Sequence, residues 1–311
     1  MNHRDSSLGS LNRRRGLRIT IIAAIVAAGL MLWLGLRNPA ARAHDFFRAT
    51  FFPIGGPALS LLETPLKRLG VIGAGVYEIQ PGVSLFLDPN DFIGNFVLHA
   101  GDWERLEWDL IAPRLPAAGV FVDVGAHVGT YSLKAAKAVG EQGRVIAIEP
   151  NPVTAAHLRQ GIAASGRNNV TVVEAAAGDR RSRLKLFAAA DANTGMASFA
   201  TGNARRSGTY QERSVEVDVI PLDQMLPALT LPRLDVLKVD AEGAETMILR
   251  GAASSIARFH PVIVVETIDA QLRELHSSVQ ELEDLLRSYG YTKASATTDN
   301  ALWIPAAVPT R

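Results

Sequence analysis

The stretch FVDVGAHVGT, residues 121–130, decides the fold of this chain. An apolar run carries Asp123 near its end, glycines follow at positions 125 and 129, and a stretch with helical spacing begins near Thr130. A strand that turns sharply into a helix at glycines is typical of nucleotide-binding α/β sheets. The alternative is an ordinary tight turn that needs glycine only for its own backbone conformation.

Outward from this stretch, short apolar runs alternate with helical stretches. The runs lie at residues 120–125, 144–150, 170–178, 234–243 and 261–267. The helical stretches lie at residues 130–139, 152–165, 245–258 and 278–288. Short buried strands that alternate with helices predict βαβ units. The expected fold class is therefore α/β and Rossmann-like, with a mostly parallel sheet and helices on both faces.

Three other segments have recognisable patterns. The stretch VYEIQPGVSLFLDP alternates around Pro81 and Gly82, which predicts a hairpin, and residues 101–115 have helical spacing. The segments RLKLF and SVEVDVI enclose the polar residues 188–213. We expect them to form a β-arm whose loop is long enough to have a function, such as shaping a substrate pocket.

The glycine turn itself narrows the choice of ligand. A dinucleotide turn reads G-x-G-x-x-G, but here His127 and Thr130 occupy the second and third glycine positions. A pyrophosphate needs bare backbone at the second position, so the Cβ of His127 disfavours NAD and FAD. Glu149, which ends the next strand, is placed to accept hydrogen bonds from both hydroxyls of a ribose. The remaining pattern, D-x-G-x-x-x-G, resembles the first motif of methyltransferases that use S-adenosylmethionine (SAM).

Further motifs strengthen this resemblance. FVDVGAHVGTYSL, VIAIEPNP, NVTVVEAAAGD, LDVLKVDAEGAETMILRGA and PVIVVE occur in the order found in the FkbM family of methyltransferases. The similarity covers roughly residues 77–305, and KVDAEGAE, residues 238–245, is its most distinctive part. The resemblance implies a SAM-dependent O-methyltransferase that acts on a hydroxyl of a sugar, a glycolipid or a related natural product.

The resemblance also implies roles for individual residues. The turn around the methionine part of SAM would be formed by Asp123, Gly125, Ala126 and Gly129, with His127 in contact through its backbone. Glu149 would hold the ribose, and Ala177, Gly178 and Asp179 would line the adenine side. The chain departs from the family at His127, where Asn is common. It also has alanine where many methyltransferases of the wider class have an acid that contacts adenine, which leaves adenine to backbone groups or Asp179.

Carboxylates at the ends of the fourth and fifth strands are the candidates for catalysis. A hydroxyl acceptor must lose a proton when it is methylated, and a positioned carboxylate can take it. We expect Asp240 to face the cofactor or the acceptor, Glu242 to be the base, and Glu266 to lie at the cleft edge. For Glu242 and Glu245 the alternative is capping of the following helix. No third carboxylate is placed to complete a cation site beside Asp240 and Glu242, so we predict no metal.

The N-terminal region differs from the body. Residues 1–48 hold eight Arg and two Asp, and they enclose an uncharged run, Ile19–Leu36. As a helix this run would be about 27 Å long, close to the thickness of a bilayer core. We predict a basic tail (residues 1–18), a single-pass anchor (residues 19–36), a linker (residues 37–76) and a methyltransferase domain (residues 77–311). The alternatives are a buried helix and a signal peptide cleaved after the small-x-small pattern at 41–43.

Charge and cofactor give opposite indications of topology. Five Arg precede the run and three follow it closely, which favours an exported body. SAM is cytosolic, however, so we expect the catalytic domain on the cytosolic face of the membrane, close to a small-molecule or glycan acceptor.

Composition excludes some functions. The body beyond residue 48 has 24 basic and 29 acidic residues, which argues against nucleic-acid binding, and the chain has no cysteine. Two other functions remain open. One is an oxidoreductase that uses NAD or a nucleotide sugar, which His127 and Thr130 disfavour. The other is a non-catalytic, membrane-tethered SAM-binding module, which the joint presence of Asp123, Glu149 and Asp240 disfavours.

Overall fold

The computed structural model describes residues 73–187, 198–199 and 214–306. The residues from Val76 onward belong to one compact unit. The predicted tail and anchor, and all but the last residues of the predicted linker, lie outside the described residues. Among the residues that the structure describes, no helix is both long and apolar enough to span a bilayer.

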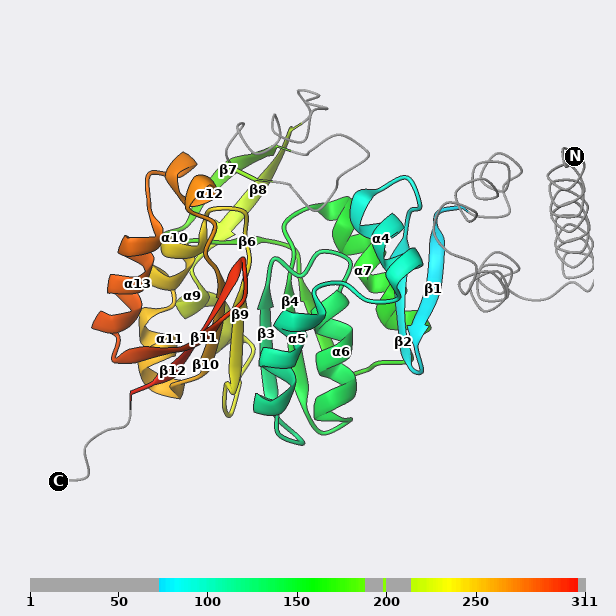
Figure 1. Ribbon diagram of the computed structural model, residues 1–311, viewed down its shortest axis with the longest axis horizontal. Coiled ribbons are helices and arrows are strands. Elements are labelled where there is room, and N and C mark those ends of the chain that lie inside the picture. Colours follow the sequence, from blue (N-terminus) through cyan, green and yellow to red (C-terminus); the bar gives the residue numbers. More distant parts are fainter. Residues whose placement is uncertain (1–72, 188–197, 200–213, 307–311) are drawn as a thin grey trace, which may run out of the picture. The chain divides into compact units, whose positions relative to one another are not determined.

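The core of the unit is a seven-stranded sheet (Figure 1) in the order β11-β12-β10-β9-β3-β4-β5. Pairing is parallel among the five strands of the apolar runs, and β12 is antiparallel to β10 and β11. The seven strands are β3 (Val120–Val124), β4 (Arg144–Ile148), β5 (Val170–Val173), β9 (Val236–Val239), β10 (Val262–Glu266), β11 (Tyr291–Ala296) and β12 (Asn300–Pro305). The predicted mostly parallel α/β sheet is therefore confirmed.

Helices cover both faces of this sheet. Even-numbered residues of β3, such as Val122, pack in one core with α9 (Leu222–Ala228), α10 (Glu245–Arg250), α11 (Ala253–Phe259) and α13 (Val279–Ser288). Phe121 points to the other face, where it packs with α5 (Arg105–Ile111) and α6 (Thr130–Val139). On that same side Leu158 of α7 (Pro152–Ala164) packs against Ala147. Strand alternation thus divides the core between two helical layers.

Smaller elements flank the sheet. The predicted hairpin is present as β1 (Gly75–Gln80) and β2 (Val83–Leu87), and Phe86 stacks on His157 of α7 with ring centroids 3.8 Å apart. Between the hairpin and β3 lie α4 (Phe92–Ala100), α5 and the 3-10 turn η2 (Ala112–Arg114). The predicted β-arm is present as β7 (Ser182–Phe187) and β8 (Ser214–Ile220), which pair antiparallel. The short helix α12 (Asp269–Glu274) follows β10.

Three predicted segments are interrupted. The run 170–178 ends its first strand at Val173, and residues Ala176–Ala177 form β6, which pairs with β8 instead. The run 234–243 ends as a strand at Val239, because Glu242 and Gly243 have φ of +53° and +104°. The stretch 245–258 is broken into α10 and α11 at Gly251, where a Cβ would lie 1.9 Å from the carbonyl oxygen of Gly178. Close contacts and turns therefore shorten elements that hydrophobicity alone would continue.

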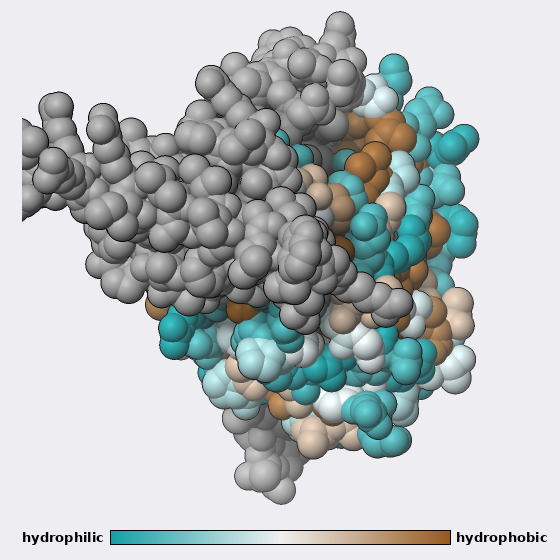
Figure 2. Space-filling model, turned by 90° about the vertical axis from the view of Figure 1, so that its right-hand side faces the viewer, coloured by the Kyte–Doolittle hydropathy of each residue, from teal (hydrophilic) through white to brown (hydrophobic). Residues whose placement is uncertain are grey.

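The strand order reverses direction at β3. After β3 the chain adds β4 and β5 on one side, whereas β9 and β10 lie on the other. Helices leave β3 and β9 on opposite faces, so their carboxyl ends form the crevice in which sheets of this type bind ligands. On the side of the molecule seen in Figure 2, hydrophobic groups are interspersed among hydrophilic ones on the described surface.

Candidate functional site

A cleft lies at the carboxyl ends of the central strands. Its empty volume is about 1060 Å³ including the open mouth. The turns after β3, β4, β9 and β10 line it together with β6 and the segment before α5. Eight of the predicted site residues line the cleft: Gly125, Ala126, His127, Glu149, Ala177, Asp240, Glu242 and Glu266.

The glycines of the turn are required by packing. Gly125 has φ +79°, and a Cβ there would lie 1.7 Å from the carbonyl oxygen of Asp240. Gly129 has φ +94°, and its Cβ would lie 2.4 Å from Leu158 Cδ1. Gly129 begins α6 and is not among the described residues that line the cleft. Both glycines would be needed without any ligand, so they fix the turn and do not by themselves specify the cofactor.

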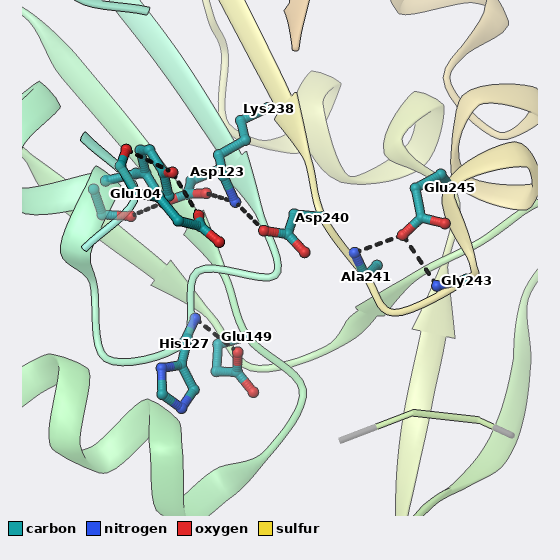
Figure 3. Close-up of polar contacts among 11 residues, drawn as sticks. Glu104, Asp123, His127, Glu149, Lys238, Asp240, Ala241, Gly243 and Glu245 are labelled. Carbon is teal, nitrogen blue, oxygen red and sulfur yellow. Dashed lines mark hydrogen bonds and ion pairs between the residues drawn. The ribbon is translucent and has the colours of Figure 1, made fainter. Parts of the chain in front are cut away.

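Glu149 is held by the backbone of two turns. The His127 N–H donates to Glu149 Oε2 at 2.9 Å and the Asn151 N–H donates to Oε1 at 2.8 Å (Figure 3). A carboxylate offers about four lone-pair positions, so two stay available for further donors. Burial raises the pKa of Glu149 to about 7, although both N–H groups lower it. This arrangement fits a ribose, whose two hydroxyls supply the remaining donors.

His127 acts in this turn through its backbone. Its φ of +50° is a conformation in which histidine is tolerated better than most side chains, and this conformation aims its N–H at Glu149. Its imidazole points away from Lys238 and Asp240 in Figure 3. Burial lowers the pKa of His127, which favours the neutral ring. The expected contact of this backbone with the cofactor stays a prediction.

Asp123 lies beneath the turn. It has no exposed surface, accepts a 2.6 Å hydrogen bond from Ser132 Oγ, and lies 3.7 Å from Lys238 Nζ. It is not among the described residues that line the cleft. Asp123 and Lys238 are register partners on β3 and β9, and both lie on the face covered by α6. The side chain expected around the methionine part of SAM is thus used to hold the sheet and α6 together.

Lys238 connects this buried acid to the cleft. Its ammonium lies between Asp123 and Asp240 (Figure 3), 3.0 Å from Asp240 Oδ2 and 4.5 Å from the centre of the Tyr131 ring. The carboxylates raise the pKa of Lys238 despite its burial, so the amine stays charged. Lys238 is part of the KVDAEGAE motif, and its place in an otherwise apolar strand was the signal of a buried charge.

Glu104 is a cleft residue that the sequence patterns did not reveal. It precedes α5, and its Oε2 accepts a 2.6 Å hydrogen bond from Tyr131 Oη. Burial raises the pKa of Glu104 to about 7, and Asp240 raises it further while Lys238 lowers it. Its neighbour Trp103 also lines the cleft, with the rings of Phe92 and Phe96 edge-on to its indole. The sequence signal was only an acid at the start of a helix.

Two carboxylates lie at the ends of β9 and β10. Glu242 accepts a 2.6 Å hydrogen bond from Gln271 Nε2, and Ser198 Oγ donates to its backbone carbonyl. Glu266 is buried, and its Oε2 has no hydrogen-bond partner in the described part of the chain. Burial raises the pKa of both acids well above the usual value, and neighbouring Asp240 adds to this. Both groups therefore bind protons more readily than an exposed carboxylate.

Glu245 has the capping role that was the alternative for this motif. Its Oε1 accepts hydrogen bonds from the N–H groups of Ala241 and Gly243, which precede α10. These hydrogen bonds stabilise the turn that contains Glu242. Glu245 is not among the described residues that line the cleft.

On the expected adenine side, the residues separate into two groups. Ala176 and Ala177 of β6 line the cleft. Gly178 and Asp179 are not among its described lining residues: Gly178 packs against Gly251, and Asp179 lies 3.4 Å from Arg180. The described residues contain no group of three or more His, Asp or Glu arranged to hold a metal ion.

Comparisons with known proteins agree with this geometry. The profile of the Methyltransferase FkbM domain matches residues 123–293. The hexuronic acid methyltransferase AglP of Haloferax volcanii is 28% identical over 166 residues, 51% of this chain and 62% of AglP. Methyltransferase sdnD of Sordaria araneosa is 28% identical over 215 residues, 61% of this chain and 79% of sdnD.

Among solved structures, the methyltransferase FkbM of Methylobacillus flagellatus has a TM-score of 0.41 and 18% identity. The match covers 68% of this chain and 52% of that one. The chain therefore spans less than two thirds of the length of AglP and of the M. flagellatus protein. The family match confirms the resemblance seen in the motifs.

Proposed function

We propose, from the premise that the chain belongs to the FkbM methyltransferase family and carries its SAM-dependent domain, that it methylates a hydroxyl group. The acceptor class we propose is a sugar, a glycolipid or a related natural product near a membrane. The observation that carries the proposal is the cleft itself, with Glu149 open to a ribose at one strand end and the half-buried Glu242 at another. The name of the relative AglP supports a saccharide acceptor.

Different residues of the chain bind the cofactor and remove the proton from the acceptor. Bound SAM supplies a methyl group that is already activated on a sulfonium, so the protein has mainly to align donor and acceptor. Glu149 accepts the ribose hydroxyls, while Ala176 and Ala177 leave room beside it. Glu242 takes the proton from the acceptor hydroxyl onto its carboxylate, and Gln271 fixes the orientation of that carboxylate. The raised pKa of Glu242 makes it a stronger base than an exposed glutamate.

Calorimetry on the full chain, purified in detergent, tests this proposal. SAM is expected to release heat with one site per chain, and NAD is expected to give none. Incubation with labelled SAM and saccharide or glycolipid extracts should then transfer label to the extract. Absence of SAM binding contradicts the proposal, and binding of NAD in its place would favour the oxidoreductase.

We also propose that residues 19–36 anchor the chain in a membrane with the domain on the cytosolic face. The length of the uncharged run supports the anchor, and the need for cytosolic SAM supports the orientation. Protease added to intact cells or spheroplasts should leave the domain intact and degrade it only after lysis. Degradation before lysis would place the domain outside.

A further inference from the structure

Glu104 lies in the cleft but outside the family match, which begins at Asp123. Its backbone has φ +48°, an unusual conformation for a glutamate, at the position before α5. Its side chain makes no cap hydrogen bond to that helix. The carboxylate instead reaches Tyr131, a cleft residue on the first turn of α6. Helix capping therefore does not account for where this side chain points.

The charges around Glu104 do not balance. Lys238 faces Asp123 and Asp240, and it also lowers the pKa of Glu104 by its charge. The nearby ammonium of Lys134 is 5.9 Å from the Tyr131 ring centre and is paired with Asp102. Lys238 thus shares its single charge among Asp123, Asp240 and Glu104, and Glu107 adds a further negative charge near Glu104. Buried carboxylates are costly unless cations compensate them, so this end of the cleft suits a positively charged ligand group.

We propose that Glu104 binds the ammonium group of the methionine part of SAM, with Tyr131 positioning its carboxylate. This inference rests on the proposed use of SAM and adds a residue from outside the recognised domain. Asp123 does not serve this role directly because it is buried against Ser132 and Lys238. Burial keeps the Tyr131 hydroxyl protonated by raising its pKa, so Tyr131 stays a donor to Glu104.

Two ligands separate this contact from the rest of the cofactor site. S-adenosylhomocysteine carries the ammonium and carboxylate of the amino acid, whereas 5′-methylthioadenosine has the same adenosine and thioether without them. Both would be titrated by calorimetry into the full chain and its Glu104→Gln variant. We expect Glu104→Gln to weaken S-adenosylhomocysteine by about 10- to 100-fold, the scale of a lost hydrogen bond to a charged group. The affinity for 5′-methylthioadenosine should stay within about twofold.

Three variants complete the design. Asp109→Asn removes a carboxylate from the exposed side of the same helix, away from the cleft lining, and should change neither affinity. Tyr131→Phe should weaken S-adenosylhomocysteine alone, by less than Glu104→Gln does. Glu104→Asp keeps the charge but shortens the side chain by one methylene. It should also weaken S-adenosylhomocysteine selectively, and it replaces Glu104→Gln if that variant does not fold.

The outcomes are distinct. A wild-type chain that binds neither SAM nor S-adenosylhomocysteine overturns the proposed function together with this inference. If the wild-type chain binds SAM and S-adenosylhomocysteine, the Glu104 variants decide the inference. Equal effects on S-adenosylhomocysteine and 5′-methylthioadenosine, or no effect on either, would overturn the inference alone.

Discussion

The turn after β3 and the turn after β9 meet at the same cleft but are built differently. In the first turn the glycines fit against neighbouring backbone and side chains, and the His127 N–H is committed to Glu149. In the second, Asp240, Glu242 and Glu245 lie within six residues: Asp240 pairs with Lys238, Glu242 accepts from Gln271, and Glu245 accepts from backbone N–H groups. The second turn thus gathers three carboxylates, whereas the first holds Glu149 through backbone groups.

This difference indicates that the two turns have different roles. In the first turn, backbone groups hold Glu149, the carboxylate that we propose receives the ribose. The second turn places acids in an environment that raises the pKa of Glu242, which is what a base acting near neutral pH requires. Changes in the first turn should therefore affect folding and cofactor binding, whereas changes in the second should affect turnover.

The sharpest test of the first turn is Gly125→Ala. The new Cβ would overlap the carbonyl oxygen of Asp240 at a φ that alanine avoids, so we expect a loss of about 4 kcal/mol or more in the free energy of unfolding. Gly166→Ala is the matched control, because Gly166, at the end of α7, also has a positive φ (+62°) but nothing within 4 Å of its Cβ. The control should lose only about 1–2 kcal/mol.

Urea unfolding of both variants measures this difference. Equal losses would show that the turn tolerates a side chain at position 125. The close packing at Gly125 would then not be required for the turn to fold.

The second turn is tested by Glu242→Gln. Glutamine keeps the size of the side chain but cannot take the acceptor proton, so we expect kcat to fall by about 10²-fold or more. The Kd for SAM should stay within about threefold, because the cofactor contacts lie elsewhere in the cleft. Steady-state kinetics and calorimetry measure the two quantities separately.

Glu266→Gln is the matched variant, since Glu266 lies at the end of the neighbouring strand and its pKa is likewise raised well above the usual value by burial. Normal turnover in Glu242→Gln, with a large loss in Glu266→Gln, would transfer the role of base to Glu266.

Part of this comparison could be predicted from sequence. Apolar runs located the five parallel strands, and Glu149 was predicted because it ends a strand next to the glycine turn. The pairing of Asp123 with Lys238 could not be predicted, because it depends on the register of β3 with β9, strands more than 110 residues apart in the chain. Alternation from Phe121 does place Asp123 on the face that α6 covers, so its burial was within reach of the pattern.

Other features had only a weak sequence signal. Glu104 enters the cleft because the segment before α5 folds over α6, and this is a tertiary contact. The end of β9 at Val239 follows from the positive φ values of Glu242 and Gly243, and only the glycine hinted at it. Side chains that reach the site from outside the βαβ units are therefore the ones that strand and turn patterns miss.

Both turns contain acids that burial makes easier to protonate, so the stability of the chain should depend on pH. The pKa of Glu149 beside the first turn and that of Glu245 in the second are each raised from 4.5 to about 7. Between these values the folded chain holds protons that the unfolded chain has released, so its stability falls as pH rises. We expect unfolding to be harder at pH 5 than at pH 8, by on the order of 2 kcal/mol for each such group.

Denaturant unfolding of the ligand-free chain across this pH range measures the effect, and Glu149→Gln should reduce the slope. The slope is the relevant quantity, because the amide nitrogen of Gln cannot accept the N–H groups that Glu149 accepts and will lower stability at every pH. A flat profile in the wild-type chain would contradict the raised pKa values.

The smallest expected effect concerns Asp179, which the sequence placed on the adenine side. Asp179 is half-buried and pairs with the exposed Arg180 at 3.4 Å, and it is not among the described residues that line the cleft. Asp179→Ala should therefore change the Kd for SAM by less than about twofold and the free energy of unfolding by less than about 1 kcal/mol. Ala177→Val is the contrasting change, because Ala177 does line the cleft and two added methyl groups would occupy ligand space. It should weaken SAM by about tenfold or more. A strong loss of SAM affinity in Asp179→Ala would instead mean that a side chain of this loop recognises adenine. Cofactor binding would then extend beyond the first turn, and the two turns alone would not account for the site.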